Sequence, residues 1–588
     1  MASIINSGYY IAGFVLLLGV LVFIHEFGHF IIAKAFKVRV ETFSIGMGKK
    51  LFTFKRGETE YAISLFPLGG YVKLTGQDPR EEVPPELEAR SFRNKPLYAR
   101  AAVVLAGPLF NAALAILVFT YLYVVGIPSV IPVMERVLSG SPAEQAGFQR
   151  GDEVLRVKDS SSSNWTRVFE LSDLERIVGD AVGRELDFEV KSAGSTETKT
   201  IKYTPTLGSE RDSTIGVMKQ RGVIKGVEKT AIGPVVVVLP DSFASSRLLP
   251  TPFWISQIAY LSNGQEKIIK TENFHDVESA WNEAVTQQGD KGEIKITGTV
   301  IEMETEESQK KETAETKKIP EEQTYTLAWL NEQERPASKL KAAGFLSSEL
   351  VLTGIMTGSP AERFGLKKGD ILSSFDNEEI QSFASFRENL QVSASTGRDL
   401  KLGWYRDGVY QETSMKPEIV MAVDPMTEAK NKQFQIGAYF LALPAQPSVR
   451  IVKADGLFQA LGLGYDRSYR LTVSMLESFY HLAKGNISPK TLGGPILILR
   501  ISGESLKQGS AAFLKMMAFI SLNLFLLNLF PIPVLDGGHL VMYMIEAVRR
   551  RPLPIKFIEM WSTAGFVLLM MLMSFVMFND IRRIIFKS

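Results

Sequence analysis

Four long apolar runs near the two ends of the chain constrain its fold more than any other feature. The first extends from about Gly8 to Ala33, and Glu26 is its one charged residue. The other three carry no charge and are residues 101–126, 516–535 and 561–579. Because about 20 apolar residues suffice to cross a bilayer as a helix, the sequence predicts a polytopic α-helical membrane protein with four spans.

The basic residues of the short loops predict the orientation of these spans. Lys34, Lys37 and Arg39 belong to a basic loop between the first two spans, and Arg549–Arg551 to a loop between the last two. Since short basic loops stay in the cytoplasm, we expect residues 127–515 and both termini outside it. No basic segment precedes the first run, so we expect a retained span rather than a signal peptide.

The central region contains an internal repeat. The sequence GSPAEQAGFQRGDEVLRV begins at Gly140, and GSPAERFGLKKGDILSSF begins at Gly358. Each copy predicts a turn, a short helix, a Gly-Asp turn and a strand, followed by a further helix and alternating strands. The pattern resembles the bacterial form of the PDZ domain.

The distance between the two copies leaves room for a third unit. VVVVLPDSFASSRLL, which begins at Val235, predicts a degenerate middle copy without the Gly-Asp turn. We therefore expect inserted α+β PDZ-like domains at 127–222, 223–332 and 333–445. Within the second, the charged stretch 303–323 predicts a solvated, mobile hairpin insertion.

The remaining segments belong to the membrane part. Residues 1–126 predict an N-terminal membrane region, and residues 511–588 a C-terminal one. Residues 446–510 contain an amphipathic pattern at 456–485, which predicts a helical segment at the membrane surface. The net charge of +2 gives no reason to expect a nucleic-acid partner. The chain has no cysteine, so any metal must be held by His, Asp or Glu.

The motif HEFGH, from His25 to His29, lies inside the first apolar run. Positions i and i+4 share a face of a helix, so the two imidazoles can bind one zinc ion while Glu26 serves as general base. Zinc lowers the pKa of water enough to make it a nucleophile at neutral pH. The alternative is a chance match in a core helix, which is disfavoured because unpaired polar groups are costly inside a membrane.

Asp536 is the candidate third ligand. It follows an apolar run that Pro531 and Pro533 break, and two glycines after it permit a turn. An aspartate at the broken end of a membrane helix needs a partner, which the zinc site supplies. His539 is a rival ligand, but two histidines and a carboxylate already complete a three-ligand site with one open position. The alternative for Asp536 is a helix stop at the interface.

Together, HEFGH and the pattern N-x-x-P-x-P-x-L-D-G-G at 528–538 resemble the site-2 protease family of intramembrane zinc metalloproteases, in its bacterial, PDZ-containing branch. Residues 38–77, which include FSIGMGKKLFTFKRGETEYAISLFPLGGYVKLTGQ, resemble that branch's membrane-reentrant β-hairpin. Three further stretches resemble sequence motifs of the same branch: AGPLFN (106–111), NISPKTLGGPILI (486–498) and FNDIRR (578–583). One or two PDZ copies are usual in that family, so a third is a departure.

The resemblance implies roles for individual residues. His25, His29 and Asp536 would bind Zn2+, and Glu26 would be the catalytic base. Asn528 would hold the unwound substrate or the oxyanion, because an amide is a suitable donor where charge develops on a carbonyl oxygen. The alternative for Asn528 is a polar side chain that bonds a neighbouring helix in lipid.

The hairpin is expected to bind substrate. It alternates apolar and polar residues and carries Gly46, Gly48, Gly69 and Gly70. A free strand edge there could take up an extended substrate by strand addition. The alternative is a structural hairpin packed on the helices.

The resemblance implies intramembrane proteolysis in a bacterial inner membrane, with the active site near the cytoplasmic side. The implied substrates are single-span membrane proteins, such as an anti-sigma factor or leftover signal peptides. Another protease would trim them first, and the PDZ-like domains would exclude those with bulky outer domains. Two other classes of function stay open. A catalytically idle PDZ membrane scaffold has no need for Glu26, and a metal transporter is disfavoured by the lack of inverted repeats.

Overall fold

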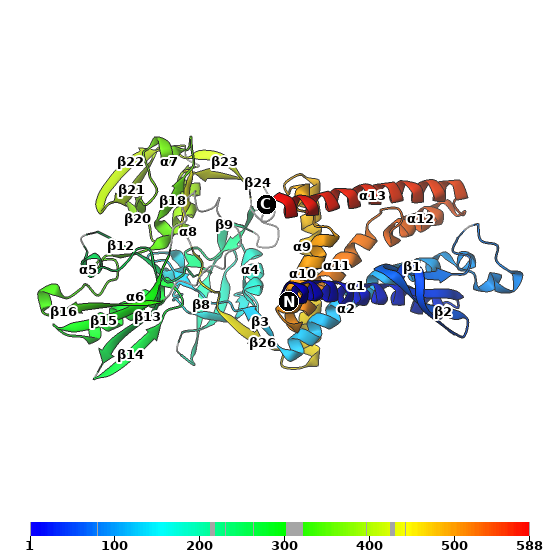
Figure 1. The fold of residues 1–588 in the computed structure, drawn as a ribbon, viewed down its shortest axis with the longest axis horizontal. Helices are drawn as coiled ribbons and strands as arrows, with labels where there is room; N and C mark the ends of the chain where they lie inside the picture. Colours follow the sequence, from blue (N-terminus) through cyan, green and yellow to red (C-terminus); the bar gives the residue numbers. More distant parts are fainter. Residues whose placement is uncertain are drawn as a thin grey trace.

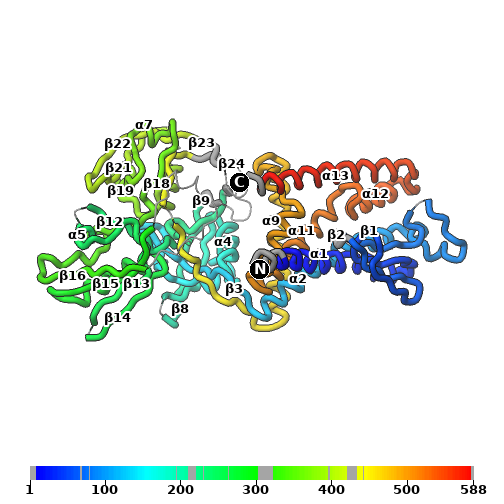
Figure 2. Tube along the Cα trace, in the orientation of Figure 1, coloured from blue at the N-terminus to red at the C-terminus, as the bar shows by residue number. Residues whose placement is uncertain are grey.

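The structure, a computed structural model, describes residues 2–586 except 79, 194, 212–217, 230, 241, 263, 302–321, 395–396, 424–429 and 442. Long helices from the two ends of the chain form one part, and small α+β units from its middle form an array beside them (Figure 1). Figure 2 shows the chain leaving the helices, passing through the array and returning. The predicted charged insertion, 303–323, lies almost entirely outside the described residues.

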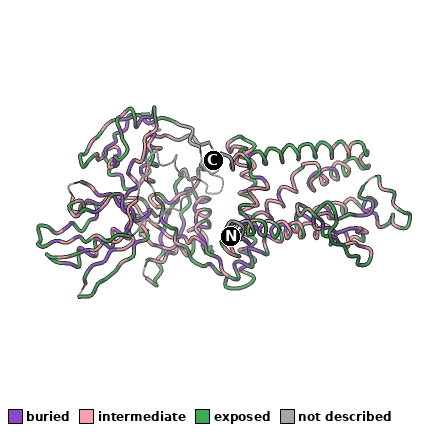
Figure 3. The backbone as a smooth tube through the Cα atoms, viewed as in Figure 1, coloured by how far each residue is buried: buried purple, intermediate pink, exposed green. Residues whose placement is uncertain are grey.

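Four helices in the described part of the chain are long and apolar enough to cross a membrane. They are α1 (Ala2–Ala35), α2 (Leu97–Val125), α11 (Ser510–Leu529) and α13 (Ile555–Phe586). Each overlaps one of the predicted apolar runs, so the expected polytopic α-helical fold is confirmed. α13 is exposed along most of its length, as a helix facing lipid should be (Figure 3).

The third span ends earlier than the predicted run 516–535, because α11 ends before Pro531. Pro531 and Pro533 have no backbone N–H to donate to the preceding turn, so the helix cannot continue through them. After a short irregular turn, a new helix, α12 (Asp536–Arg549), begins. Asp536 therefore starts a helix instead of following the end of one.

Two further helices follow the array, α9 (Leu457–Ala483) and α10 (Pro495–Lys507). α9 contains the predicted amphipathic pattern and lies across the ends of the spans, between them and the array (Figure 1). It packs closely on α2, because a Cβ on Gly464 would lie only 2.8 Å from the carbonyl oxygen of Ile116.

The two copies of the repeat have the same topology. The first unit has a sheet in the order β6-β5-β7-β8, and the third has one in the order β20-β19-β21-β22. The helices are α3 (Pro142–Gln145) and α4 (Leu171–Gly179) in the first unit, and α7 (Pro360–Arg363) and α8 (Phe383–Ala394) in the third. The strands are β5 (Glu153–Asp159), β6 (Thr166–Arg167), β7 (Leu186–Lys191), β8 (Thr198–Tyr203), β19 (Ile371–Phe375), β20 (Glu378–Glu379), β21 (Leu400–Arg406) and β22 (Val409–Met415).

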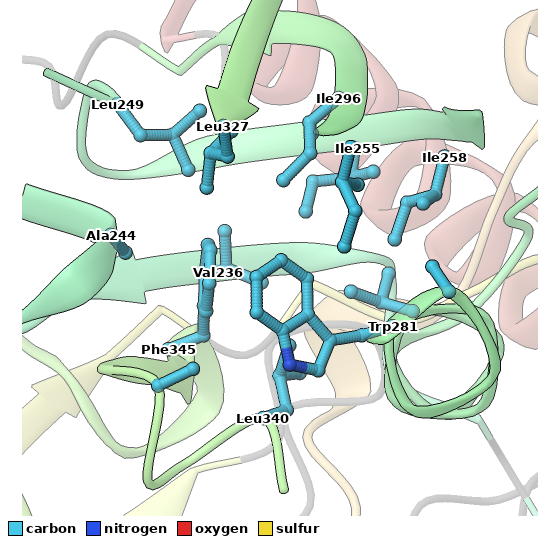
Figure 4. Close-up of a cluster of buried hydrophobic side chains, with 14 of the residues drawn as sticks. Val236, Ala244, Leu249, Ile255, Ile258, Trp281, Ile296, Leu327, Leu340 and Phe345 are labelled. Carbon is cyan, nitrogen blue, oxygen red and sulfur yellow. The ribbon is translucent and has the colours of Figure 1, made fainter. Parts of the chain in front are cut away.

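The middle unit has a larger sheet, in the order β16-β15-β13-β12-β17 with β14 paired to β13. Helix α6 (Phe274–Gln287) packs on it and buries Trp281 among hydrophobic side chains (Figure 4). The other elements are β12 (Val235–Val238), α5 (Phe243–Ser246), β13 (Phe253–Ser262), β14 (Gln265–Lys270), β15 (Gly292–Val300), β16 (Gln323–Trp329) and β17 (Phe345–Ser347).

One contact recurs in all three units. A glycine with positive φ lies against the serine that caps the short helix, where a side chain would collide: Gly226 with Ser141, Gly344 with Ser242, and Gly437 with Ser359. In each unit the carbonyl of this glycine accepts a 2.8 Å hydrogen bond from the backbone N–H of the residue just after the strand that precedes the helix. The middle unit therefore keeps the geometry of its neighbours although its sequence has diverged.

The strand that follows this glycine extends two of the units past their predicted boundaries. β17 pairs with β12, and Phe345 belongs to the core of the middle unit, which therefore continues beyond 332. In the first unit, β11 (Val227–Glu228) pairs with β4 (Arg136–Val137), so that unit continues beyond 222. The other paired strands are β9 (Thr206–Arg211) with β10 (Met218–Val223), β18 (Leu352–Ile355) with β25 (Ala438–Phe440), and β23 (Glu418–Val423) with β24 (Lys430–Gln435).

A two-stranded neck joins the array to the spans. β3 (Ile127–Val130), just after α2, pairs with β26 (Val449–Val452), just before α9. Beside the neck, the buried carboxylate of Glu170 in the first unit accepts hydrogen bonds from Tyr123 of α2 at 3.0 Å and from Arg467 of α9 at 2.9 Å. The first unit is thereby attached to two membrane-part helices.

The predicted hairpin consists of β1 (Val40–Arg56) and β2 (Thr59–Leu74). Both strands bend, so that residues 42–45 pair with 70–73 and also with 60–63. The bends need positive φ, which glycine adopts without strain, with 89° at Gly46, 86° at Gly48 and 108° at Gly69. Within the described residues, the segment 70–74, called here the edge segment, is paired on one side.

Candidate metal centre and active-site cavity

The two motif histidines lie one turn apart on α1, facing α2. The Nε2 atoms of His25 and His29 are 3.2 Å apart. The helices approach closely at this level because two glycines lie between them. A Cβ on Gly28 would press against the carbonyl of Ala106, and a Cβ on Gly107 would collide with the His29 imidazole. Small residues at this crossing therefore make room for the histidines.

Each imidazole has a second contact that orients it. His29 Nδ1 lies 2.8 Å from the carbonyl oxygen of Val103, which can only accept, so His29 carries its proton on Nδ1. His25 Nδ1 lies 3.2 Å from the side-chain amide of Asn111, whose oxygen is buried and has no hydrogen-bond partner within the described part of the chain. Because the amide keeps its shape when turned over, that oxygen can accept from the His25 Nδ1–H. Both Nε2 atoms are then free to bind a metal.

Asp536 reaches the histidines from the other end of the chain. Its Oδ2 lies 3.3 Å from His25 Nε2, and its Oδ1 lies 3.6 Å from His29 Nε2. The turn before it is tight, because side chains on Gly537 and Gly538 would collide with the preceding backbone. Asp536 Oδ2 is buried and has no hydrogen-bond partner among the described residues, which is costly unless a cation binds it.

His25, His29 and Asp536, called here the ligand group, have the donor chemistry and spacing that a zinc ion needs. Their ligand atoms lie within 4.8 Å of one another. Tetrahedral zinc with bonds of about 2.0–2.1 Å holds its ligands about 3.3 Å apart. The distances here are 3.2–3.6 Å. His539 lines the same cavity but does not belong to the group. Two nitrogens and one carboxylate leave a fourth position open.

The ligand group opens into a cavity of about 710 Å³ between α1, α2, α12 and the hairpin. Glu26 and Asn528 both line this cavity, Glu26 from the motif and Asn528 from the last turn of α11. The edge segment forms another wall, where a Cβ on Gly70 would lie 2.9 Å from Glu26 Cγ. At the wall formed by α2 and α12, Arg100 and Glu546 form two hydrogen bonds of 2.6 and 3.2 Å.

The four hairpin glycines divide into two kinds. Gly70 lines the cavity and lies against Glu26. Gly46, Gly48 and Gly69 lie at the bends, where their positive φ shapes the hairpin. The structure therefore brings one of the four predicted substrate-binding glycines to the ligand group and places the other three at the turns that form the edge segment.

Sequence reasoning missed the groups that support the histidines. Asn111 is fully buried beside His25, and Gly107 leaves room for His29. Both belong to the stretch AGPLFN, four residues apart and so on one face of α2. An asparagine in an uncharged span was a usable signal, because a buried amide needs a partner. The Val103 carbonyl gave none, since a backbone contact leaves no mark in the sequence.

Comparisons with known proteins identify the family of the chain. The profile of peptidase family M50 matches residues 13–572. The regulator of sigma-E protease RseP of Escherichia coli (strain K12) is 28% identical over 581 residues, covering 98% of both chains. Protease RseP of Yersinia pestis is 27% identical over 589 residues, covering 99% of this chain and 100% of that one. A Pasteurella multocida (strain Pm70) relative, whose name contains the words zinc metalloprotease, is 28% identical over 577 residues, covering 97% and 98%.

Among solved structures, a PDZ domain protein from Parabacteroides distasonis overlaps 53% of this chain and 95% of its own at 9% identity. The TM-score is 0.11, too low to bear on the fold.

Four spanning helices around a two-histidine, one-carboxylate site define a membrane-bound metallopeptidase. The chain belongs to peptidase family M50, the site-2 protease family that its motifs resemble. The expected enzyme class, a zinc metalloprotease of the site-2 type, and the expected metal are thereby confirmed.

Proposed function

We propose that this protein is an intramembrane endopeptidase that cuts the transmembrane segments of single-span membrane proteins. The observation that carries the proposal is the convergence of the ligand group and Glu26 on one cavity beside a spanning helix. Ionisable groups are costly in a membrane and mark function there. A peptidase has reason to bear that cost when the bond it cuts lies in the membrane.

In this proposal the ligand group holds zinc, which supplies a Lewis acid for the scissile carbonyl and activates water. Glu26 takes a proton from the attacking water and passes it to the leaving amide nitrogen. Asn111 and the Val103 carbonyl keep the imidazoles in place, so little reorganisation is needed when substrate binds.

Asn528 is proposed to bind the substrate carbonyl. It lies on the cavity wall with Glu26, and no hydrogen bond engages its side chain among the described residues. An amide N–H that is free in this way can donate to the oxygen on which charge develops. The same property argues against the alternative of an asparagine that links two helices.

The edge segment is proposed to bind the unwound substrate. A substrate helix hides its peptide bonds in internal hydrogen bonds and must open before attack. Gly70, Tyr71 and Val72 line the cavity, and this edge of the hairpin is unpaired within the described residues. An added substrate strand would therefore pass directly beside Glu26 and the ligand group.

We further propose that the hairpin enters the bilayer beside α1. Phe43 contacts Phe23 and Phe30 of this span, with ring centroids 5.9 and 5.4 Å apart. The hairpin also exposes a set of large apolar side chains: Met47, Leu51, Phe52, Phe54, Ile63 and Leu65. A surface of this kind is stable against lipid and a liability in water.

We also propose how the protein is oriented in the membrane and that the PDZ-like units filter substrates. The short basic loops favour a cytoplasmic location for the hairpin end, in the inner membrane of a bacterium, with the array on the other side. The array joins the spans at the ends opposite the hairpin (Figure 1). From there the PDZ-like units would exclude substrates with bulky outer domains until another protease has trimmed them.

The proposal is tested with full-length protein in liposomes that also contain a single-span test substrate. We expect the Glu26→Gln variant to keep zinc and to lose cleavage by about 10²-fold or more. Glu504→Gln, an exposed carboxylate change on α10, should cleave at the wild-type rate. Comparing membrane proteomes of cells with wild-type protein and the Glu26→Gln variant then identifies trapped substrates.

Two results would contradict the proposal. Cleavage that persists in the Glu26→Gln variant would remove the assigned base. Absence of cleavage in the wild type, with its zinc bound, would favour the idle PDZ scaffold that the sequence leaves open.

A further inference from the structure

A second, smaller cavity of about 450 Å³ lies where α1 ends and the chain approaches α2. It is lined by Lys34, Lys37, Val38, Ala89, Arg90 and Lys95, of which four are basic and none is acidic. It shares no lining residue with the ligand-group cavity. The proposed proteolysis gives this basic cavity no role.

The basic cavity lies at a membrane surface, because two spans meet there. Lys34 is in the last turn of α1, and Lys95 is just before the start of α2. Tyr98, which is 69% exposed, lies beside it with its ring 6.0 Å from that of Phe36. Exposed aromatic rings of this kind are typical of the membrane–water boundary. The cationic groups therefore lie at the level of lipid phosphates.

One carboxylate contacts this basic group. Glu58, in the turn of the hairpin, lies 2.6 Å from the Arg90 guanidinium and 2.7 Å from Lys34 Nζ. Its pKa is lowered to about 2 by these two partners, so it is ionised at neutral pH. The one negative charge of Glu58 does not neutralise the four positive charges, so the basic cavity keeps a net positive charge. Lys37 and Lys95 form no ion pair with a described carboxylate.

We propose that the basic cavity binds the phosphate of an anionic phospholipid headgroup. Ammonium and guanidinium groups bind phosphate oxygens through charge-assisted hydrogen bonds. A basic pocket beside the end of a spanning helix is the kind of site that collects anionic headgroups. The acyl chains would continue along the lipid-facing side of α1, where Ile31 is exposed. A zwitterionic headgroup has no net charge to offset the positive surplus and should bind more weakly.

The test uses full-length protein in detergent and native mass spectrometry with added phosphatidylglycerol. We expect a Lys37→Gln/Lys95→Gln double variant to retain about tenfold less phosphatidylglycerol than the wild type, because each basic residue near the surface strengthens binding severalfold. Neither residue holds Glu58, so the hairpin turn stays anchored. The matched control is Lys49→Gln/Lys55→Gln, which removes the same charge from the same loop outside the basic cavity and should lower retention far less.

Further arms separate the possible outcomes. Phosphatidylcholine should bind the wild type and the double variant equally weakly, and Lys37→Arg/Lys95→Arg should restore phosphatidylglycerol binding. Equal retention of phosphatidylglycerol by wild type and the Gln double variant would overturn the proposal and leave these residues as orientation signals. Displacement of the lipid by millimolar glycerol phosphate would overturn it in favour of a soluble phosphate ligand.

Discussion

The His29 imidazole lies so close to Gly107 of the neighbouring helix that no side chain fits between them. The ring cannot retreat, because its Nδ1 is held 2.8 Å from the carbonyl oxygen of Val103 on that same helix. α2 thus fixes the position of a ligand that α1 supplies. The metal site depends on this helix crossing as much as on its three ligand side chains.

Gly107→Ala should therefore damage the site without unfolding the protein. Alanine favours a helix, but its methyl group would push His29 from its place, and we expect zinc affinity to fall about 10- to 100-fold. Competition with a zinc chelator measures the change. Gly19→Ala on α1, where nothing lies within 4 Å, is the matched control. Wild-type zinc affinity in Gly107→Ala would refute this account of the crossing.

Asn111→Ala should weaken the site through His25. The imidazole would lose the partner at 3.2 Å that holds its Nδ1 and would rotate more freely. Losing a supporting group of this type lowers metal affinity or activity about 10- to 100-fold. The same chelator competition, with the exposed Asn282→Ala as control, checks this expectation. Asn111→Asp should retain more affinity than Asn111→Ala, because an oxygen remains to accept from the ring.

Gly344→Ala tests the contact shared by the three units. Gly344 has φ 96°, and a Cβ there would collide with Ser242. We expect a loss of about 2–4 kcal/mol in the stability of the middle unit, the sum of backbone strain and overpacking. Gly264→Ala, with φ 79° and open space, should cost only the backbone strain of about 1–2 kcal/mol. Hydrogen exchange of α6 measures both, and equal losses would show that the serine contact is unimportant.

The contact between the first and third units should depend on pH. Glu228 accepts from Ser382 across this contact, and burial raises the pKa of its carboxyl above the ordinary 4.5, although Arg136 opposes the rise. A raised pKa in the folded state means that the stabilising contribution is present below about 4.5 and is lost as pH rises through the folded value. The contact should therefore loosen with increasing pH.

Hydrogen exchange at residues 381–383, corrected for the intrinsic effect of pH, follows this loosening. Glu228→Gln should remove the dependence, whereas Glu412→Gln, on an outer strand of the third unit, should preserve it. Protection that grows with pH, or an unchanged profile in Glu228→Gln, would show that Glu228 does not control the contact.

The spans, and the placement of the two motif histidines on one helix face, could be predicted because their signals are local. A long apolar run implies a span by its length, and HEFGH places two imidazoles on one helix face wherever it is helical. Asp536 was identified because it follows a proline-broken run. The new helix that begins at Asp536, after Pro531 and Pro533, was not predicted. The length of an apolar run does not show where a helix inside it ends. Here two prolines without N–H donors end one helix, and another begins after them.

The sequence does not indicate which strands pair when they lie far apart in the chain. β17 closes the middle unit against β12, which lies far earlier in the chain, and neither strand carries a mark of its partner. The bends of the hairpin, which let residues 42–45 pair on two sides, are another case. Gly46, Gly48 and Gly69 were noticed as glycines, but their use at bends depends on φ values that only the folded chain defines.

The zinc content of purified full-length variants tests the central claim most directly, together with X-ray absorption at the zinc edge. We predict one zinc per chain in the wild type, bound by two imidazoles and further oxygen ligands without sulfur. Asp536→Ala should lose the metal, whereas Glu546→Gln, a carboxylate change in the same cavity, should keep it. Full zinc content with an unchanged spectrum in Asp536→Ala would contradict the ligand group on which the account depends.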